Sequence, residues 1–149
     1  FFKPFVQVNH SMTKKKGTVR GMHFQYPPYT ESKVVTCIRG EVRDIVVDIR
    51  NNSKTYLQWH SAVLSDKNLR SFYIPEGFAH GFQTLTDDCE LLYLHTSTYQ
   101  GDTMITGYCF TPQDGNSLLS SCAATLWWLY GDSYTEKMVS FDDYLFTSV

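Results

Sequence analysis

The sequence predicts an all-β protein folded as an antiparallel jelly-roll barrel. Short runs of β-branched and aromatic residues recur roughly every ten residues, and turn residues separate them. Aromatic residues make up 15% of the 149 residues, a share that favours strands over helical bundles. No segment before about residue 117 shows the periodicity of an amphipathic helix. These observations together favour a closed antiparallel sheet.

Two hairpins are expected along the chain. The β-branched runs within residues 34–48 are interrupted at Gly40, which is a strand, tight turn, strand pattern. Residues 83–85 and 90–96 flank the acidic pair Asp87-Asp88 in the same way. We therefore expect each pair of neighbouring strands to hydrogen-bond to one another.

Single strands are expected at residues 20–25, 55–64, 71–74 and 78–82 because each is rich in β-branched or aromatic side chains. The tail from Asn116 onward fits neither period and leaves room for a short helix. A chain of 149 residues suits one domain, spanning residues 1–149.

Charge and composition limit the partners. A net charge of −2 gives no overall attraction to nucleic acid or to an anionic membrane. No apolar run approaches the ~20 residues that span a bilayer, and residues 1–4 lack the plan of a signal peptide. The four cysteines show no C-x-x-C pair or zinc-ligand spacing and are expected to be reduced thiols. We therefore expect a cytoplasmic protein without nucleic-acid or membrane partners.

Four side chains suggest acid–base chemistry. His23 and His80 each lie in a glycine-punctuated strand segment, and Lys33 and Tyr93 follow them by about a dozen residues. A histidine can remove a proton near neutral pH, a lysine can stabilise a developing oxyanion, and a tyrosine can return a proton. Each histidine alone is also explained as a hydrogen-bonded core residue. A lysine in a barrel wall, however, needs an ion-pair partner or a function, because burying an unpaired ammonium is costly.

A metal site is not predicted. Pro75, Gly77 and His80 match the second half of the cupin metal signature, but the first half is missing. His23 is followed two residues later by Gln25, which is a poor metal ligand where a second histidine would be needed.

A series of motifs occurs in one order along the chain: His10-Ser11, Arg20–Gln25, Lys33–Val35, Gly40–Val42, Val47–Arg50, Ile74–Phe82 and Leu92-Tyr93. Together they resemble the dTDP-4-dehydrorhamnose 3,5-epimerases, from about Phe5 to about Thr111. The resemblance implies a cupin-type jelly roll, a homodimer, and catalysis without metal or organic cofactor. It also implies a nucleotide-linked 4-keto-6-deoxy sugar as substrate, epimerised at C3 and C5.

The resemblance also implies roles for individual residues. His23 would be the general base, Lys33 would stabilise the enolate oxygen at C4, and Tyr93 would protonate the opposite face. Asp143 is the nearest candidate for the carboxylate that partners His23. The implied substrate-binding residues are Gln7, Asn9, Arg20, Gln25, His80 and Tyr99.

The match is incomplete at both ends. The family's N-terminal strand would precede Phe1, and residues 112–149 match poorly. Two alternatives therefore stay open. One is a single-carbon epimerase or a ketoisomerase acting on a related sugar nucleotide. The other is a cupin that binds sugar nucleotides without turning them over.

Overall fold

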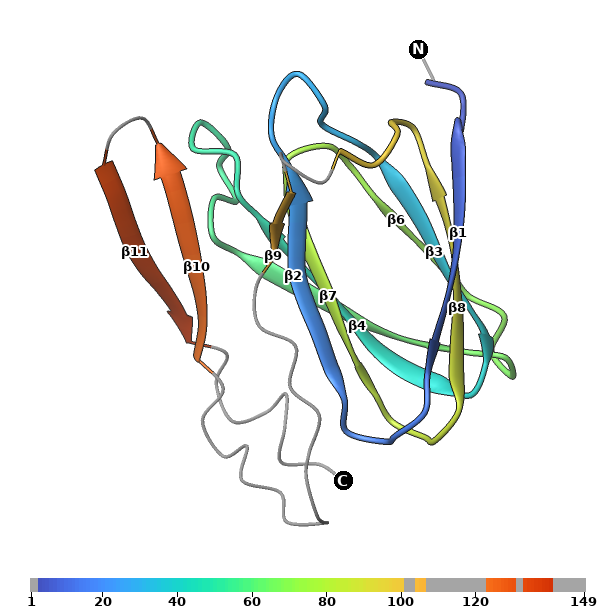
Figure 1. Ribbon diagram of the computed structural model, residues 1–149. Helices are drawn as coiled ribbons and strands as arrows, with labels where there is room; N and C mark the ends of the chain where they lie inside the picture. The colour runs from blue at the N-terminus through green and yellow to red at the C-terminus, as the bar shows by residue number, and fades with distance from the viewer. Residues whose placement is uncertain (1–2, 101–103, 107–122, 131–132, 141–149) are drawn as a thin grey trace.

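The computed structural model describes residues 3–100, 104–106, 123–130 and 133–140, and every regular element within them is a β-strand. The strands are β1 (Gln7–Thr13), β2 (Val19–Gln25), β3 (Lys33–Arg39), β4 (Glu41–Asp48), β5 (Trp59–Ser65), β6 (Ser71–Ile74), β7 (Phe78–Thr84), β8 (Cys89–His95), β9 (Met104–Thr106), β10 (Ala123–Tyr130) and β11 (Ser133–Ser140). Two antiparallel sheets face each other, ordered β1-β8-β3-β6 and β5-β4-β7-β2-β9 (Figure 1). The predicted all-β, jelly-roll fold class is confirmed.

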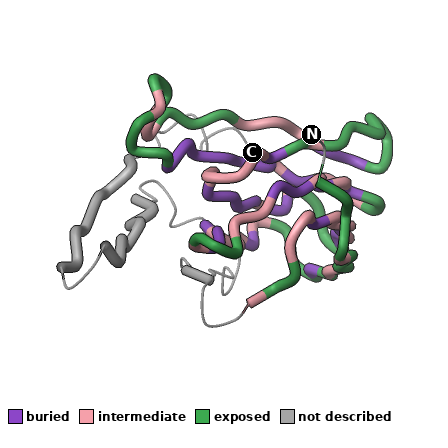
Figure 2. Tube along the Cα trace, turned by 90° about the horizontal axis from the view of Figure 1, so that it is seen from above, coloured by how far each residue is buried: buried purple, intermediate pink, exposed green. Residues whose placement is uncertain are grey.

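The main hydrophobic core lies between the two sheets. Its buried members come from strands of both sheets: Val35, Cys37, Val42, Val46, Leu64, Ile74, Phe82, Cys89 and Leu91. A second cluster lies on the other side of the five-stranded sheet and is formed by alternate residues of β2, β4 and β7 and by the residue that follows β4: Met22, Phe24, Ile45, Val47, Ile49 and Ala79. In Figure 2 the buried stretches lie mainly in the interior of the described part, and the exposed stretches lie mainly at its periphery. Strand alternation thus separates an inner from an outer face.

The hairpin expected within residues 34–48 is wrong. Both strands form, but β3 pairs with β8 and β6, whereas β4 pairs with β5 and β7. A single residue, Gly40, links them, with φ at +76° and its N–H donating to Asp66 at 3.0 Å. One residue is too short a link for a two-residue hairpin turn, and the chain passes from one sheet to the other there.

The second expected hairpin is also wrong. β7 lies in the five-stranded sheet and β8 in the four-stranded sheet, so the chain crosses between sheets around Asp87-Asp88 as well. A pattern of strand, turn and strand shows that the chain reverses, but it does not show which strands become hydrogen-bonded neighbours.

The short helix considered for the tail is not found where the tail is described. β10 and β11 instead pair antiparallel, from Ala123 opposite Ser140 to Tyr130 opposite Ser133. Three aromatic residues lie within residues 127–130, and such bulky side chains favour strands. No helix in the described part of the chain has the length and apolar character needed to cross a membrane.

Cys37 and Cys89 are buried and free, as expected of reduced thiols. The other two cysteines, Cys109 and Cys122, lie outside the described residues.

Gly21 lets β2 and β7 approach closely beside His23. Its φ is +132°, and a Cβ there would lie 2.5 Å from the Gly81 Cα and 2.9 Å from the His80 carbonyl oxygen. We expect Gly21→Ala to lower the free energy of unfolding by roughly 2–4 kcal/mol, because backbone strain and overpacking add. Urea denaturation measures this. The control is Gly17→Ala, which also replaces a glycine with a positive φ, at +81°. An equal loss in both variants would contradict the close-approach argument.

Candidate active site

The sequence-predicted histidines lie side by side on the inner face of the five-stranded sheet. The β2–β7 register places His23 opposite His80, and directly opposed residues share a face. His80 alternates with Phe82 of the main core, so both histidines face the other sheet. Arg20, opposite Phe82, shares this face.

Lys33 and Tyr93 lie on the inner face of the four-stranded sheet. The β3–β8 register places Lys33 opposite His95 and Val35, a main-core residue, opposite Tyr93. Alternation therefore directs Lys33 and Tyr93 toward the five-stranded sheet. The edge-to-face contact between the His80 and Tyr93 rings, with centroids 6.4 Å apart, joins the two sheets. The structure thus brings His23, Lys33, His80 and Tyr93 together.

His23 is held in its neutral form. Burial is the largest cause that lowers the pKa of the imidazole, followed by electrostatic repulsion from His80, Lys33 and Arg20, and together these bring it from 6.5 to about 4. At neutral pH the ring therefore carries a free lone pair. A neutral imidazole in this position can accept a proton.

The same shift predicts an acid-sensitive stability. Between pH 6.5 and 4 the unfolded chain protonates His23 while the folded chain resists it. The free energy of unfolding is thus undiminished above about pH 6.5 and falls by roughly 3 kcal/mol as the pH drops to about 4. Urea denaturation across this range measures the slope. The His23→Asn variant should show a shallower slope, and equal slopes in both proteins would contradict the assignment.

Tyr93 is held in its protonated form. Burial raises the pKa of its phenol to about 12, even though the hydrogen bond with Ser11 opposes the shift. The Ser11 Oγ lies 3.3 Å from the Tyr93 hydroxyl, and the His95 ring stacks on the Tyr93 ring at 6.0 Å. The phenol therefore keeps its proton at neutral pH, as a general acid must.

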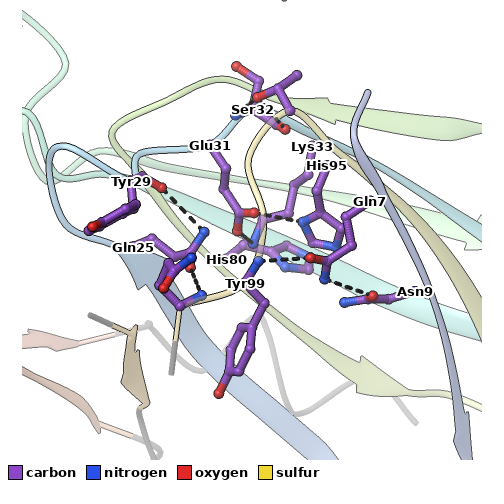
Figure 3. Close-up of polar contacts among 12 residues, drawn as sticks. Gln7, Asn9, Gln25, Tyr29, Glu31, Ser32, Lys33, His80, His95 and Tyr99 are labelled. Carbon is purple, nitrogen blue, oxygen red and sulfur yellow. Dashed lines mark hydrogen bonds and ion pairs between the residues drawn. The ribbon is translucent and has the colours of Figure 1, made fainter. Parts of the chain in front are cut away.

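Lys33 has the partner that a buried lysine requires. Only 5% of the residue is exposed, and its Nζ lies 3.2 Å from the Glu31 Oε1. The other Glu31 oxygen lies 2.7 Å from the His95 Nδ1 (Figure 3). Sequence reasoning missed both Glu31 and His95. The sequence did offer one signal, since residues two apart in an extended segment share a face. Glu31 lies two residues before Lys33, and His95 lies two residues after Tyr93.

His80 is paired with an aspartate. Its Nε2 lies 2.9 Å from the Asp44 Oδ2, and both side chains are buried. Asp44 was also missed, although a carboxylate in the apolar run of β4 is itself a signal of a buried partner. The resemblance gave His80 a role in substrate binding, and the Asp44 contact orients its ring.

The other proposed binding residues meet at one end of the inner face. The Gln7 amide donates to the Asn9 Oδ1 at 2.9 Å and accepts from the Tyr99 backbone N–H at 2.8 Å (Figure 3). Gln25 is buried, and its Oε1 accepts from the Gln100 backbone N–H at 2.8 Å. Gln25 thus connects β2 to the segment after β8 by a hydrogen bond. The Tyr99 side chain, in that segment, is half exposed.

Asp143, the expected partner of His23, lies outside the described residues. Within the described residues, no three histidine, cysteine or acidic side chains are grouped as metal ligands.

A model of the dTDP-4-dehydrorhamnose 3,5-epimerase family matches residues 1–113 of the chain. The chain belongs to this family. The dTDP-4-dehydrorhamnose 3,5-epimerase of Shigella flexneri is 48% identical over 95 residues, which are 64% of this chain and 52% of that protein. The chain spans about half the length of the curated relatives it matches.

Solved structures of epimerases share the fold. The dTDP-6-deoxy-D-glucose-3,5-epimerase RmlC from Legionella pneumophila, in complex with dTDP-4-keto-L-rhamnose, superimposes with a TM-score of 0.68 at 40% identity, over 71% of this chain and 55% of that one. ChmJ, a 3'-monoepimerase from Streptomyces bikiniensis in complex with dTDP-quinovose, gives a TM-score of 0.65 at 32% identity, over 69% of this chain and 52% of that one. Both double and single epimerases are therefore similar to this member of the family.

Proposed function

We propose that this chain epimerises a dTDP-linked 4-keto-6-deoxy sugar at C3 and C5, converting dTDP-4-dehydro-6-deoxyglucose to dTDP-4-dehydrorhamnose. The observation that carries the proposal is the grouping of a neutral imidazole, a protonated phenol and a buried ammonium on facing sheets. Family membership supports the same chemistry.

The C4 ketone makes the hydrogens on C3 and C5 acidic. His23 removes one of them, and the electrons move onto the ketone oxygen as an enolate. The Lys33 ammonium stabilises that oxygen, where a fixed cation is worth most in a buried site. Tyr93 then protonates the carbon from the other face, which inverts its configuration. Once His23 has released the abstracted proton to water and Tyr93 has regained a proton from water, the same steps at the second carbon complete the double epimerisation.

The wider setting belongs to the same proposal. We infer a single domain over residues 1–149, a homodimer, a cytoplasmic location and catalysis without metal or organic cofactor. Arg20 is a suitable contact for the nucleotide diphosphate, because guanidinium pairs with phosphate through two parallel hydrogen bonds. Gln7, Asn9 and Tyr99 lie at the end of the inner face where the nucleotide would approach.

Solvent exchange tests the function. The protein is incubated with dTDP-4-keto-6-deoxyglucose in deuterated water, and NMR counts deuterium at C3 and C5. Incorporation at both carbons with inverted product supports the double epimerase. Incorporation at one carbon identifies a single-carbon epimerase, an activity that the similar monoepimerase ChmJ exemplifies. Binding without incorporation identifies a non-catalytic cupin.

A further inference from the structure

Lys33 and His95 present two basic groups directly opposite each other. They are Cα partners on β3 and β8, and both side chains face inward. Burying an ammonium and an imidazole side by side is costly unless their polar atoms find partners. Their side chains are 7% and 10% exposed, so water screens the pair only weakly. A group between them is needed to keep both in place.

Glu31 is that group. Its Oε1 lies 3.2 Å from the Lys33 Nζ and its Oε2 lies 2.7 Å from the His95 Nδ1. Burial alone would raise the pKa of Glu31, but the hydrogen bond from His95 and the charge of Lys33 outweigh it, and the pKa lies below its usual value. The carboxylate therefore stays ionised and bridges two strands.

The bridge also orients His95. Because an ionised carboxylate only accepts hydrogen bonds, the Nδ1 facing Glu31 must carry the hydrogen. The Nε2 is buried and has no hydrogen-bond partner among the described residues. The ring stacks on Tyr93, with an angle of 23° between the two planes. One carboxylate thus links the ammonium of Lys33 to the ring that supports Tyr93 (Figure 3).

We propose that Glu31 and His95 are positioning residues for the epimerisation. Glu31 holds the Lys33 ammonium where the enolate oxygen develops, and His95 holds Glu31 while supporting the Tyr93 ring. This inference rests on the proposed function. Its physical basis is that a stabilising charge contributes fully only when its position is fixed before the reaction.

The test is a double-mutant cycle on the full chain with dTDP-4-keto-6-deoxyglucose. Glu31→Gln keeps the shape and removes the charge, so we expect kcat to fall about 10- to 100-fold while KM changes less than about threefold. In a Lys33→Met background, the same substitution should lower the exchange rate less than about twofold further, because its effect acts through Lys33. Glu31→Asp, which keeps the charge, should recover part of kcat.

Glu90→Gln is the matched control. Glu90 also bridges a histidine and a cation, since it lies 3.0 Å from the His10 Nε2 and 3.3 Å from the Arg39 Nη1. It belongs to the same strand as His95 but faces outward, and its loss should leave kcat unchanged.

The outcomes separate the two proposals. If the parent chain is active but the effects of Glu31→Gln and Lys33→Met on the exchange rate multiply independently, the positioning role is overturned. The proposed function is unaffected by that outcome. A parent chain that neither exchanges nor epimerises would overturn the proposed function, and the positioning role of Glu31 with it. If Glu31→Gln does not fold, Glu31→Asp decides: kcat equal to that of the parent despite the shorter side chain would overturn the role.

Discussion

Replacement of His23 by Asn is expected to abolish both deuterium exchange and epimerised product. The neutral His23 ring is the proposed base, and asparagine cannot accept a proton, so neither carbon loses its hydrogen. We expect a fall of about 10²-fold or more in both rates, the usual contribution of a general base. NMR in deuterated water measures exchange and product together.

His10→Asn is the control for this substitution. His10 is exposed on β1, and its Nε2 contacts Glu90 at 3.0 Å. Its loss should leave both rates unchanged. If the His23 variant still exchanges at the parental rate, another group removes the proton and the role given to His23 is wrong.

Replacement of Tyr93 by Phe is expected to separate exchange from inversion. The phenol is the proposed acid, and burial raises its pKa to about 12, so it holds a proton until the carbanion forms. In the Phe variant, His23 can still remove a proton and return deuterium to the same face. Deuterium should therefore enter the substrate, while inverted product falls about 10²-fold.

Tyr73→Phe is the control, because Tyr73 is exposed on β6. A Tyr93→Phe variant that makes inverted product at the parental rate would show that another acid serves the opposite face. A variant that loses exchange and inversion equally would show that Tyr93 acts before or during proton removal.

Strand positions and side-chain faces were predictable from sequence because they are local. The expected strand at residues 71–74 coincides with β6, and β7 contains residues 78–82. The strand expected at residues 55–64 begins only at Trp59, because turns occupy residues 51–57 and Leu57 has φ at +63°. Alternation within β7 is a local pattern of the same kind, and it puts His80 on the inner face together with Phe82.

Strand partners were not predictable because they depend on distant parts of the chain. The link at Gly40 looks like a hairpin turn, and only the pairing of β3 with β8 shows that it crosses between sheets. The partners Asp44 and Glu31 were missed for a related reason. The apolar run around Asp44 indicates that this carboxylate has a buried partner, but the sequence does not show that the partner is His80, nor that Glu31 contacts both Lys33 and His95.

The crossings at Gly40 and at Asp87-Asp88 bear on how the protein reaches its native state. Neither turn closes a local hairpin. β4 can pair early with the next strand, β5, but β3 pairs only with β6 and β8, which lie further along the chain. Loop-closure entropy is then lost before most favourable contacts form, as in other β proteins that fold slowly. His23 and Tyr93 belong to different sheets, so docking of the sheets creates the site. A nucleotide sugar that contacts both would stabilise the whole fold rather than one segment of it.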